Sequence, residues 1–402
     1  MDQKQPLPNN EDANQQSEVS PAATLATEPK VNPTPTVEAG TPIHGHGPKK
    51  WLIALIILVL VAAGAGGWFA IWHKTSKPVV VVPAKLIRIG LSMDNLQELR
   101  WPQDRDAMIA EAHKKGASVT VLVANGDDAT QVAQIENLIS QKVSVIIVIP
   151  HNASALTAAI EDAHTAGIKV ISYDRLLTND DVDSYVTANS TTVGQLQAQY
   201  VMNAVPASVK VANVALIDGS PTDNNATLVH NGAMSVLQPL VDSGKIKLVL
   251  DTFIADWDPD TAQSTIAAYL ASGGKLDAAV VANDGMAGGV IQALTKAKLA
   301  GTIPVSGQDA ELPAVQRLVS GTQTVTMYKP VKVLGAKAVD IAIELANGKA
   351  VDTTGPATNN GKVDVPTYEI QPIAVTKNSI QSVIIQNGWL TRQDIYGTTS
   401  AN

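Results

Sequence analysis

Residues 143–175 read VSVIIVIPHNASALTAAIEDAHTAGIKVISYDR, and this stretch decides the fold. An apolar run at Val143–Ile149 precedes a helical stretch at 153–166, and a second apolar run follows at Ile168–Ser172. Strand-length runs that alternate with amphipathic helices are typical of βαβ units, whose parallel strands are covered on both faces. The stretch therefore predicts a parallel sheet in an α/β fold.

The same alternation extends in both directions from this unit. Before it lie the apolar runs Leu86–Leu91 and Val119–Val123 and helical stretches at 102–115 and 128–141. After Thr187 the pattern restarts, and helices are expected near 191–204, 222–240, 259–272 and 285–298. Two repeats of this size predict two α/β lobes with parallel sheets. The final residues, 350–402, are mixed in character and predict no regular order of elements.

The first 84 residues differ from the rest in composition. Residues 1–50 contain eight prolines and no aromatic residue, which is typical of a disordered tail. Residues 51–72 carry no charge and have a tryptophan at each end. At ~1.5 Å per residue they reach roughly 33 Å, enough to cross a membrane, and the indoles match its interfaces. We expect a retained transmembrane helix and a linker at 73–84. A cleaved signal ending near Ala63–Gly64–Ala65 is the alternative, disfavoured by the long polar segment before the span.

Composition and motifs argue against several classes of function. A net charge of −8 gives no basic surface for nucleic acid, and the absence of cysteine excludes disulfides and thiolate sites. No dinucleotide fingerprint, phosphate loop, nucleophile elbow or zinc motif is found. His44 and His46 lack a third ligand. The series Asp256, Asp258, Asp260 lacks the glycine and glutamate of an EF-hand loop. We therefore expect no enzyme, no cofactor and no metal site.

Short polar clusters occur where six of the apolar runs end. They are Glu98–Leu99–Arg100–Trp101, Asp174–Arg175, Asp223–Asn224–Asn225, Asn283–Asp284, Gln308–Asp309 and Lys329. In open parallel sheets, ligands bind beyond the carboxyl ends of the strands. Each sugar hydroxyl both donates and accepts a hydrogen bond, and an apolar sugar face can lie on an aromatic ring. Carboxylates, amides, arginines and an indole at this edge therefore predict a sugar-binding site.

Most of these clusters also have a purely structural interpretation. An ion pair at a helix end or a turn is the alternative for Arg100 and for Asp174–Arg175, and a core position is the alternative for Trp101. Helix capping is the alternative for Asp223 and Asn283, because Asp and Asn favour that position. Capping and binding are compatible, since helix N-termini present free N–H groups to a ligand. A loop carboxylate and a surface lysine are the alternatives for Asp309 and Lys329.

The order of the motifs resembles that of a known family. The motifs that recur in register include Leu99–Arg100–Trp101, Asp104–Arg105–Asp106, Ala124–Asn125–Gly126, Tyr173–Asp174–Arg175, Gly219–Ser220–Pro221, Gly307–Gln308–Asp309–Ala310 and Tyr328–Lys329–Pro330. Over about residues 86–390 the chain resembles the type I periplasmic sugar-binding proteins, above all those that bind D-xylose for ABC importers. The resemblance implies two Rossmann-like lobes joined by three hinge strands. Lobe 1 would comprise 85–188 and about 329–362, and lobe 2 would comprise 189–328 and about 363–395.

The resemblance also implies which side chains hold the sugar. They are Arg100, Trp101, Asp174, Arg175, Asp223, Asn225, Trp257, Asn283, Asp309 and Lys329. The polar groups would bond the ring and hydroxyl oxygens, the lysine would reach the sugar from the hinge, and the two indoles would pack on its faces. The chain departs from the family at Ala188–Asn189, where an aromatic–Asp pair is usual, and before Val214, where a small insertion lies. These departures bear on closure and on sugar selectivity.

Two functions follow as expectations. The first is a single-pass protein of the cell membrane whose extracytoplasmic lobes capture a pentose, D-xylose foremost, for an ABC permease. The second is a sensory subunit that signals to a membrane histidine kinase or chemoreceptor. Neighbouring permease and ATPase genes would favour the first, and a kinase gene the second. Repressors share this fold, but they need a DNA-binding head where this chain has an apolar span.

Overall fold

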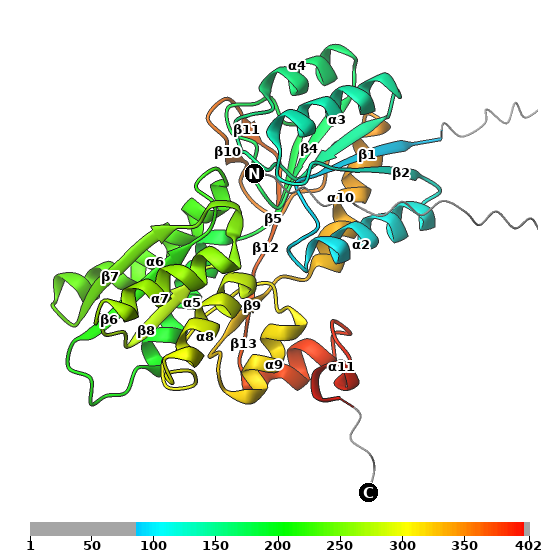
Figure 1. Cartoon of the computed structure of the whole chain (residues 1–402). Coiled ribbons are helices and arrows are strands. Elements are labelled where there is room, and N and C mark those ends of the chain that lie inside the picture. Colours follow the sequence, from blue (N-terminus) through cyan, green and yellow to red (C-terminus); the bar gives the residue numbers. More distant parts are fainter. Residues whose placement is uncertain (1–85, 398–402) are drawn as a thin grey trace, which may run out of the picture. The chain divides into compact units, whose positions relative to one another are not determined.

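A computed structural model describes residues 86–397, and the expected tail, membrane span and linker at 1–84 lie outside them. Among residues 86–397, none of the helices combines the length and the apolar character needed to span a bilayer. This part of the chain forms two α/β lobes, each with a parallel sheet, as the sequence pattern predicts (Figure 1).

Lobe 1 is built on a six-stranded, fully parallel sheet with the order β12-β5-β4-β3-β1-β2. Its strands are β1 (Arg88–Met93), β2 (Ser118–Val123), β3 (Val145–Val148), β4 (Lys169–Tyr173), β5 (Ser184–Ala188) and β12 (Thr367–Ile370). Side chains alternate between the two faces of a strand. Ile147 of β3 accordingly packs into one core and Ile146 into the other. Burial on both faces explains why this strand is uniformly apolar.

Two pairs of helices cover this sheet (Figure 1). Helices α2 (Trp101–Lys114) and α10 (Val331–Ala346) pack on one face, and α3 (Asp128–Ser140) and α4 (Thr157–Thr165) pack on the other. The observed bounds of α2 and α3 lie within one residue of the predicted ones. Gly167, with φ of 75°, follows α4 in the left-handed conformation that commonly ends helices. A small hairpin, β10 (Thr358–Asn359) and β11 (Asp364–Val365), completes the lobe.

Lobe 2 contains a parallel sheet of order β7-β6-β8. The strands are β6 (Ala212–Asp218), β7 (Ile246–Phe253) and β8 (Ala278–Val281), and a separate antiparallel pair is formed by β9 (Thr326–Tyr328) and β13 (Ile373–Val375). The helices are α5 (Ser190–Ala204), α6 (Asn224–Asp242), α7 (Pro259–Ala271), α8 (Asp284–Lys296), α9 (Leu312–Ser320) and α11 (Arg392–Tyr396). Short helical turns lie at Ala255–Trp257, Lys377–Ser379 and Ile380–Ile385.

The chain passes between the lobes three times, in agreement with the three hinge strands that the resemblance implies. The passages follow β5, β9 and β12. Because β12 pairs with β5 in the first sheet, the last passage follows Ile370, later in the chain than the expected boundary near 362. Asn189, at the first passage, accepts a hydrogen bond from the backbone of Thr192 and donates one to Glu369. It therefore caps α5 and connects the first passage to β12.

Candidate functional site

The ten side chains predicted to hold the ligand line one cavity between the lobes. Its lining is Glu98, Arg100, Trp101, Asp174, Arg175, Asp223, Asn225, Trp257, Asn283, Gln308, Asp309 and Lys329. The space among them, with adjoining open solvent included, is about 240 Å³. It lies at the carboxyl ends of the strands, where the fold places ligands.

Arg100 forms the first ion-pair centre of the site, on the side of lobe 1. It immediately precedes α2, and its guanidinium holds Asp104 through two contacts, Nε–Oδ2 at 3.2 Å and Nη2–Oδ1 at 3.0 Å. Its Nη1 donates to Asp174 Oδ1 at 3.0 Å. Trp101 begins the helix, packs in the lobe 1 core and lies under the Arg100 guanidinium, 4.2 Å from ring centroid to Cζ. Arg100 is therefore part of an ion pair and Trp101 is part of the core, and both residues also line the cavity.

Arg175 forms the second centre and joins the lobes. Its Nη1 donates to Asp94 at 2.6 Å and its Nη2 to Glu98 at 2.8 Å, both in lobe 1. Its Nε lies 2.8 Å from Asp223 Oδ2 of lobe 2. A buried guanidinium is tolerated only when such partners replace the lost water. The carboxylates accordingly raise the pKa of Arg175, although burial by itself would lower it.

The start of α6 brings lobe 2 into the site. Asp223 caps this helix by accepting from the backbone of Asn225 at 2.8 Å, so the capping interpretation is also correct. Asn225 Nδ2 donates across the cleft to the carbonyl of Asp174 at 3.0 Å. Asn225 Oδ1 is buried and has no hydrogen-bond partner among the residues that the structure describes. It is therefore an acceptor available to a ligand hydroxyl.

Trp257 is held by its surroundings in a fixed orientation. It lies in the short turn after β7 with φ of 56°, and its Nε1 donates to Asp223 Oδ2 at 3.2 Å. Its ring packs directly on Gly219, where an added Cβ would come within 2.2 Å of the ring. Only glycine leaves room for the indole at this point. Trp257, which only the family resemblance assigned to the site, thus has a defined place beside the cavity.

Lys329 and Asp309 close the site near the hinge. Lys329 directly follows β9, and its Nζ lies 2.9 Å from Asp309 Oδ1 and 3.6 Å from Asp174 Oδ1. Asp309 also accepts from Arg100 at 3.4 Å. Burial alone would raise the pKa of Asp174, but the charges of Arg100 and Lys329 outweigh it and lower this pKa to about 2. Asp174 is therefore an ionised acceptor throughout the neutral range.

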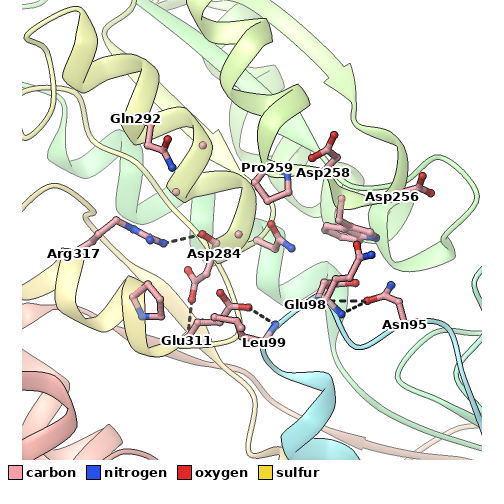
Figure 2. Close-up of a pocket in the computed structure, with 17 residues that line it drawn as sticks. Asn95, Glu98, Leu99, Asp256, Asp258, Pro259, Asp284, Gln292, Glu311 and Arg317 are labelled. Carbon is pink, nitrogen blue, oxygen red and sulfur yellow. Dashed lines mark hydrogen bonds between the residues drawn. The ribbon is translucent and has the colours of Figure 1, made fainter. Parts of the chain in front are cut away.

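A second, larger pocket adjoins the cavity and shares Glu98, Trp257 and Asn283 with it. Figure 2 shows Glu98 and Leu99 of lobe 1 facing Asp284, Glu311 and Arg317 of lobe 2 across this pocket. The amide of Leu99 donates to Glu311 Oε1 at 3.2 Å, a further contact between the lobes. Asn283 caps α8 through the backbone of Met286, whereas Asp284 accepts from Gln323, Thr326 and the backbone of Glu311. Asn283 therefore lines the cavity, whereas Asp284 belongs to a buried network of hydrogen bonds.

Four polar residues of this region are missing from the predicted set of ten. Glu98 and Gln308 line the cavity, and Asp94 and Asp104 hold the two arginines in place. Glu98 and Gln308 belong to the clusters that mark the strand ends, so their signal was present in the sequence. Asp104 lies four residues after Arg100, a spacing that favours an ion pair on a helix. Asp94 carries no such local signal.

Comparison with known proteins places this chain among close relatives. A family model described as a periplasmic binding protein domain matches residues 89–350. D-xylose-binding periplasmic proteins of Haemophilus influenzae and Escherichia coli are both 43% identical to it, over 78% and 77% of this chain and 93% of each relative. A multiple sugar-binding periplasmic receptor of Rhizobium radiobacter is 32% identical over 75% of this chain and 90% of the relative.

Solved structures agree with this relationship. A solute-binding protein of an ABC transporter from Clostridium phytofermentans, with bound β-D-glucose, superposes with a TM-score of 0.72 at 30% identity. It covers 77% of this chain, and 99% of its own length is matched. Since the family model spans more than half of the chain and the relatives are matched over nearly their whole length, the chain belongs to the periplasmic binding protein family, with its type I fold.

Proposed function

We propose that this protein captures a neutral monosaccharide, D-xylose in particular, outside the cytoplasm and delivers it to an ABC permease. The observation that carries the proposal is a cavity in which hydrogen-bonding groups of both lobes meet beside two indoles. The 43% identity to D-xylose-binding periplasmic proteins supports the choice of sugar.

The electrostatics of the cavity favour a ligand without charge. Four carboxylates and three cations line it, and both arginines and the lysine contact carboxylates. A neutral hydroxyl can accept from a cation and donate to a carboxylate without leaving either charge unpaired. An anionic ligand would meet the carboxylates at close range. Hydrogen bonds to charged groups each contribute ~1.5–3 kcal/mol, so a few of them suffice for tight binding of a small sugar.

The contacts between the lobes support a closing mechanism. Asp174 and Arg175 of lobe 1 bond Asn225 and Asp223 of lobe 2, so each lobe alone presents only part of the site. A sugar held between them would add contacts to both sides and favour the closed arrangement. A permease can then distinguish loaded from empty protein by the separation of the lobes.

The sequence of the first 84 residues supports attachment to the membrane. The uncharged stretch 51–72 is long enough to span the bilayer and has a tryptophan at each end. In the proposed arrangement it is retained as a single-pass anchor, residues 1–50 are cytoplasmic, and both lobes face outward. The anchor would keep the captured sugar close to its permease.

Titration calorimetry on the full-length protein in detergent tests the binding function. D-xylose, L-arabinose, D-ribose, D-glucose and glycerol would be titrated in parallel. We expect one site per chain that takes D-xylose more tightly than the hexose or glycerol. Heat from glucose alone would change the assigned sugar, and no heat from any sugar would contradict the proposed function.

A second measurement separates transport from sensing. Deletion of the gene should abolish uptake of labelled D-xylose at low external concentration. If uptake persists while xylose-induced transcription is lost, the sensory role is the correct one.

A further inference from the structure

Asp218 is a buried carboxylate outside the sugar site. It is the last residue of β6, its exposed fraction is 0%, and neither of its oxygens has a hydrogen-bond partner among residues 86–397. An unpaired buried carboxylate is costly, because burial removes the water that stabilises its charge. Such a group either remains protonated or binds a cation.

The pairing of β6 with β7 brings a second carboxylate to the same place. In this parallel register Leu216 is opposite Asp251, and Asp218 is opposite Phe253. Residues opposite one another, and those two positions along, point to the same face of a sheet. Asp218 and Asp251 therefore lie on one face, which also carries Leu216 and packs with α6.

Helix α6 supplies a nitrogen ligand above these carboxylates. His230 Nε2 lies 3.2 Å from Asp251 Oδ1, and its ring is 5.4 Å from that of Phe253, which limits its rotation. One atom from each of Asp218, His230 and Asp251 can be chosen so that all three lie within 4.8 Å of one another. Ligands at ~2.0 Å from a tetrahedral ion are roughly 3.3 Å apart, so small side-chain rotations would complete the set.

The chemistry of this set selects the kind of ion. One imidazole and two carboxylates make a mixed nitrogen and oxygen site, which suits Zn²⁺ and related transition metals more than Ca²⁺ or Mg²⁺. Asp251 and His230 are partly exposed, so an ion can enter from solvent, whereas Asp218 is fully buried. We propose that Asp218, His230 and Asp251 form a Zn²⁺ site in lobe 2, with water completing the coordination.

The proposed site differs in kind from the sugar cavity. It would connect β6, β7 and α6 and so stabilise lobe 2. Sequence alone does not reveal it, because its three residues are spread along the chain without a metal-binding spacing.

The test uses full-length protein without a histidine tag. His44→Ala and His46→Ala are included in every variant, so that the tail cannot bind the metal. We expect ZnCl₂ to bind with one ion per chain in calorimetry and to raise the melting temperature, with weaker effects from CaCl₂ and MgCl₂. Loss of an outer-shell partner already weakens metal sites ~10–100-fold. Asp218→Asn and His230→Gln should therefore each weaken Zn²⁺ binding by at least about tenfold.

The control is His113→Gln, which removes an exposed histidine of α2 and should leave zinc binding unchanged. Binding of D-xylose by Asp218→Asn would verify that this variant is folded. His230→Gln tests the same zinc site at a more exposed position, where a substitution disturbs the fold less. If the parent and both variants bind zinc equally, or if zinc leaves the melting temperature of the parent unchanged, Asp218 is only a buried neutral acid and the proposal is wrong.

Discussion

Arg175 Nε and Asp223 Oδ2 lie 2.8 Å apart and form an ion pair between lobe 1 and lobe 2. Arg175 lies two residues after the end of β4, whereas Asp223 caps α6, so the pair connects the carboxyl edges of the two sheets. Both side chains are almost fully buried. Breaking this pair without disturbing the helix cap would show how far it contributes to closure.

Asp223→Asn makes this separation, because asparagine still caps a helix but carries no charge. We expect a shift toward open protein and roughly tenfold or greater loss of xylose affinity, since a hydrogen bond between charged groups contributes ~1.5–3 kcal/mol. Small-angle scattering with and without xylose would measure the radius of gyration. The parent should contract at a lower sugar concentration than the variant. Identical contraction curves would show that the pair is not a determinant of closure.

Asp309→Ala tests the acceptor beside the hinge. Asp309 contacts both Lys329 and Arg100, and in the proposed complex it also accepts from a sugar hydroxyl. Its loss should weaken xylose binding ~10–150-fold by the same reasoning. The matched control is Asp364→Ala, at an exposed hairpin position. Calorimetry should separate the two variants, and equal affinities would remove Asp309 from the site.

Gly219→Ala tests the packing of Trp257 on Gly219 without altering any polar group. The added methyl would come within 2.2 Å of the indole, so the ring must shift from its present position. We expect weaker xylose binding and a change in tryptophan fluorescence. Gly285→Ala is the control, because its added methyl would meet no atom closer than 3.6 Å. Normal affinity in Gly219→Ala would mean that the orientation of Trp257 is unimportant.

Glu311 predicts a pH dependence of stability. Burial, followed by the negative charges of Asp284, Asp309 and Glu98, raises its pKa to about 9. Between its ordinary pKa of 4.5 and 9, the folded protein keeps this proton and the unfolded chain releases it. The free energy of unfolding should therefore fall as the pH rises across this range.

Glu311→Gln should flatten that dependence, because the amide is neutral at every pH and can still accept from Leu99. Chemical denaturation at pH 5, 7 and 9 would measure the effect. The control is Glu136→Gln, at an exposed position on α3, which should keep the slope of the parent. Parallel pH profiles for the parent and Glu311→Gln would contradict the prediction.

The proposed anchor predicts a defined topology. Protease added to the outer face of intact membranes should release a fragment that contains both lobes, while a tag at the N-terminus remains protected. A mature protein that begins near Gly66 would instead identify the apolar stretch as a cleaved signal. Immunoblotting against the tag and against the lobes distinguishes these results.

Much of the fold was predictable because the elements of a βαβ unit carry local patterns. The apolar runs that form β3 and β4, and the helices α2 and α3, were located within a few residues. Strand β5 was not among the predicted runs, since Ser184–Ala188 mixes polar and apolar residues although every one of them is buried. The position of β12 depends on parallel pairing with β5, a contact between segments far apart in the chain.

The candidate site likewise has a part that the sequence predicted and a part that it did not. Nine of the ten predicted cavity residues lie in the polar clusters at strand ends, and the family resemblance added Trp257. Capping at Asp223 and Asn283 coexists with their place in the cavity. What the sequence could not supply was the pairing of charges between segments that lie far apart in the chain. Asp94, for example, contacts Arg175 from a strand end 81 residues away. Such pairs arise from the arrangement of strands in the sheet and have no local spacing.

The three passages between the lobes restrict how relatives of this chain can recombine. Lobe 1 takes its helix α10 from beyond the second passage, and Leu334 of that helix packs with Ile89 of β1. A single genetic crossover between two relatives therefore always leaves at least one lobe with a core of mixed parentage. A chimera with an intact lobe from each parent needs three junctions, after β5, β9 and β12. Exchange of sugar specificity by recombination should accordingly be rarer than exchange by point substitution at the cavity.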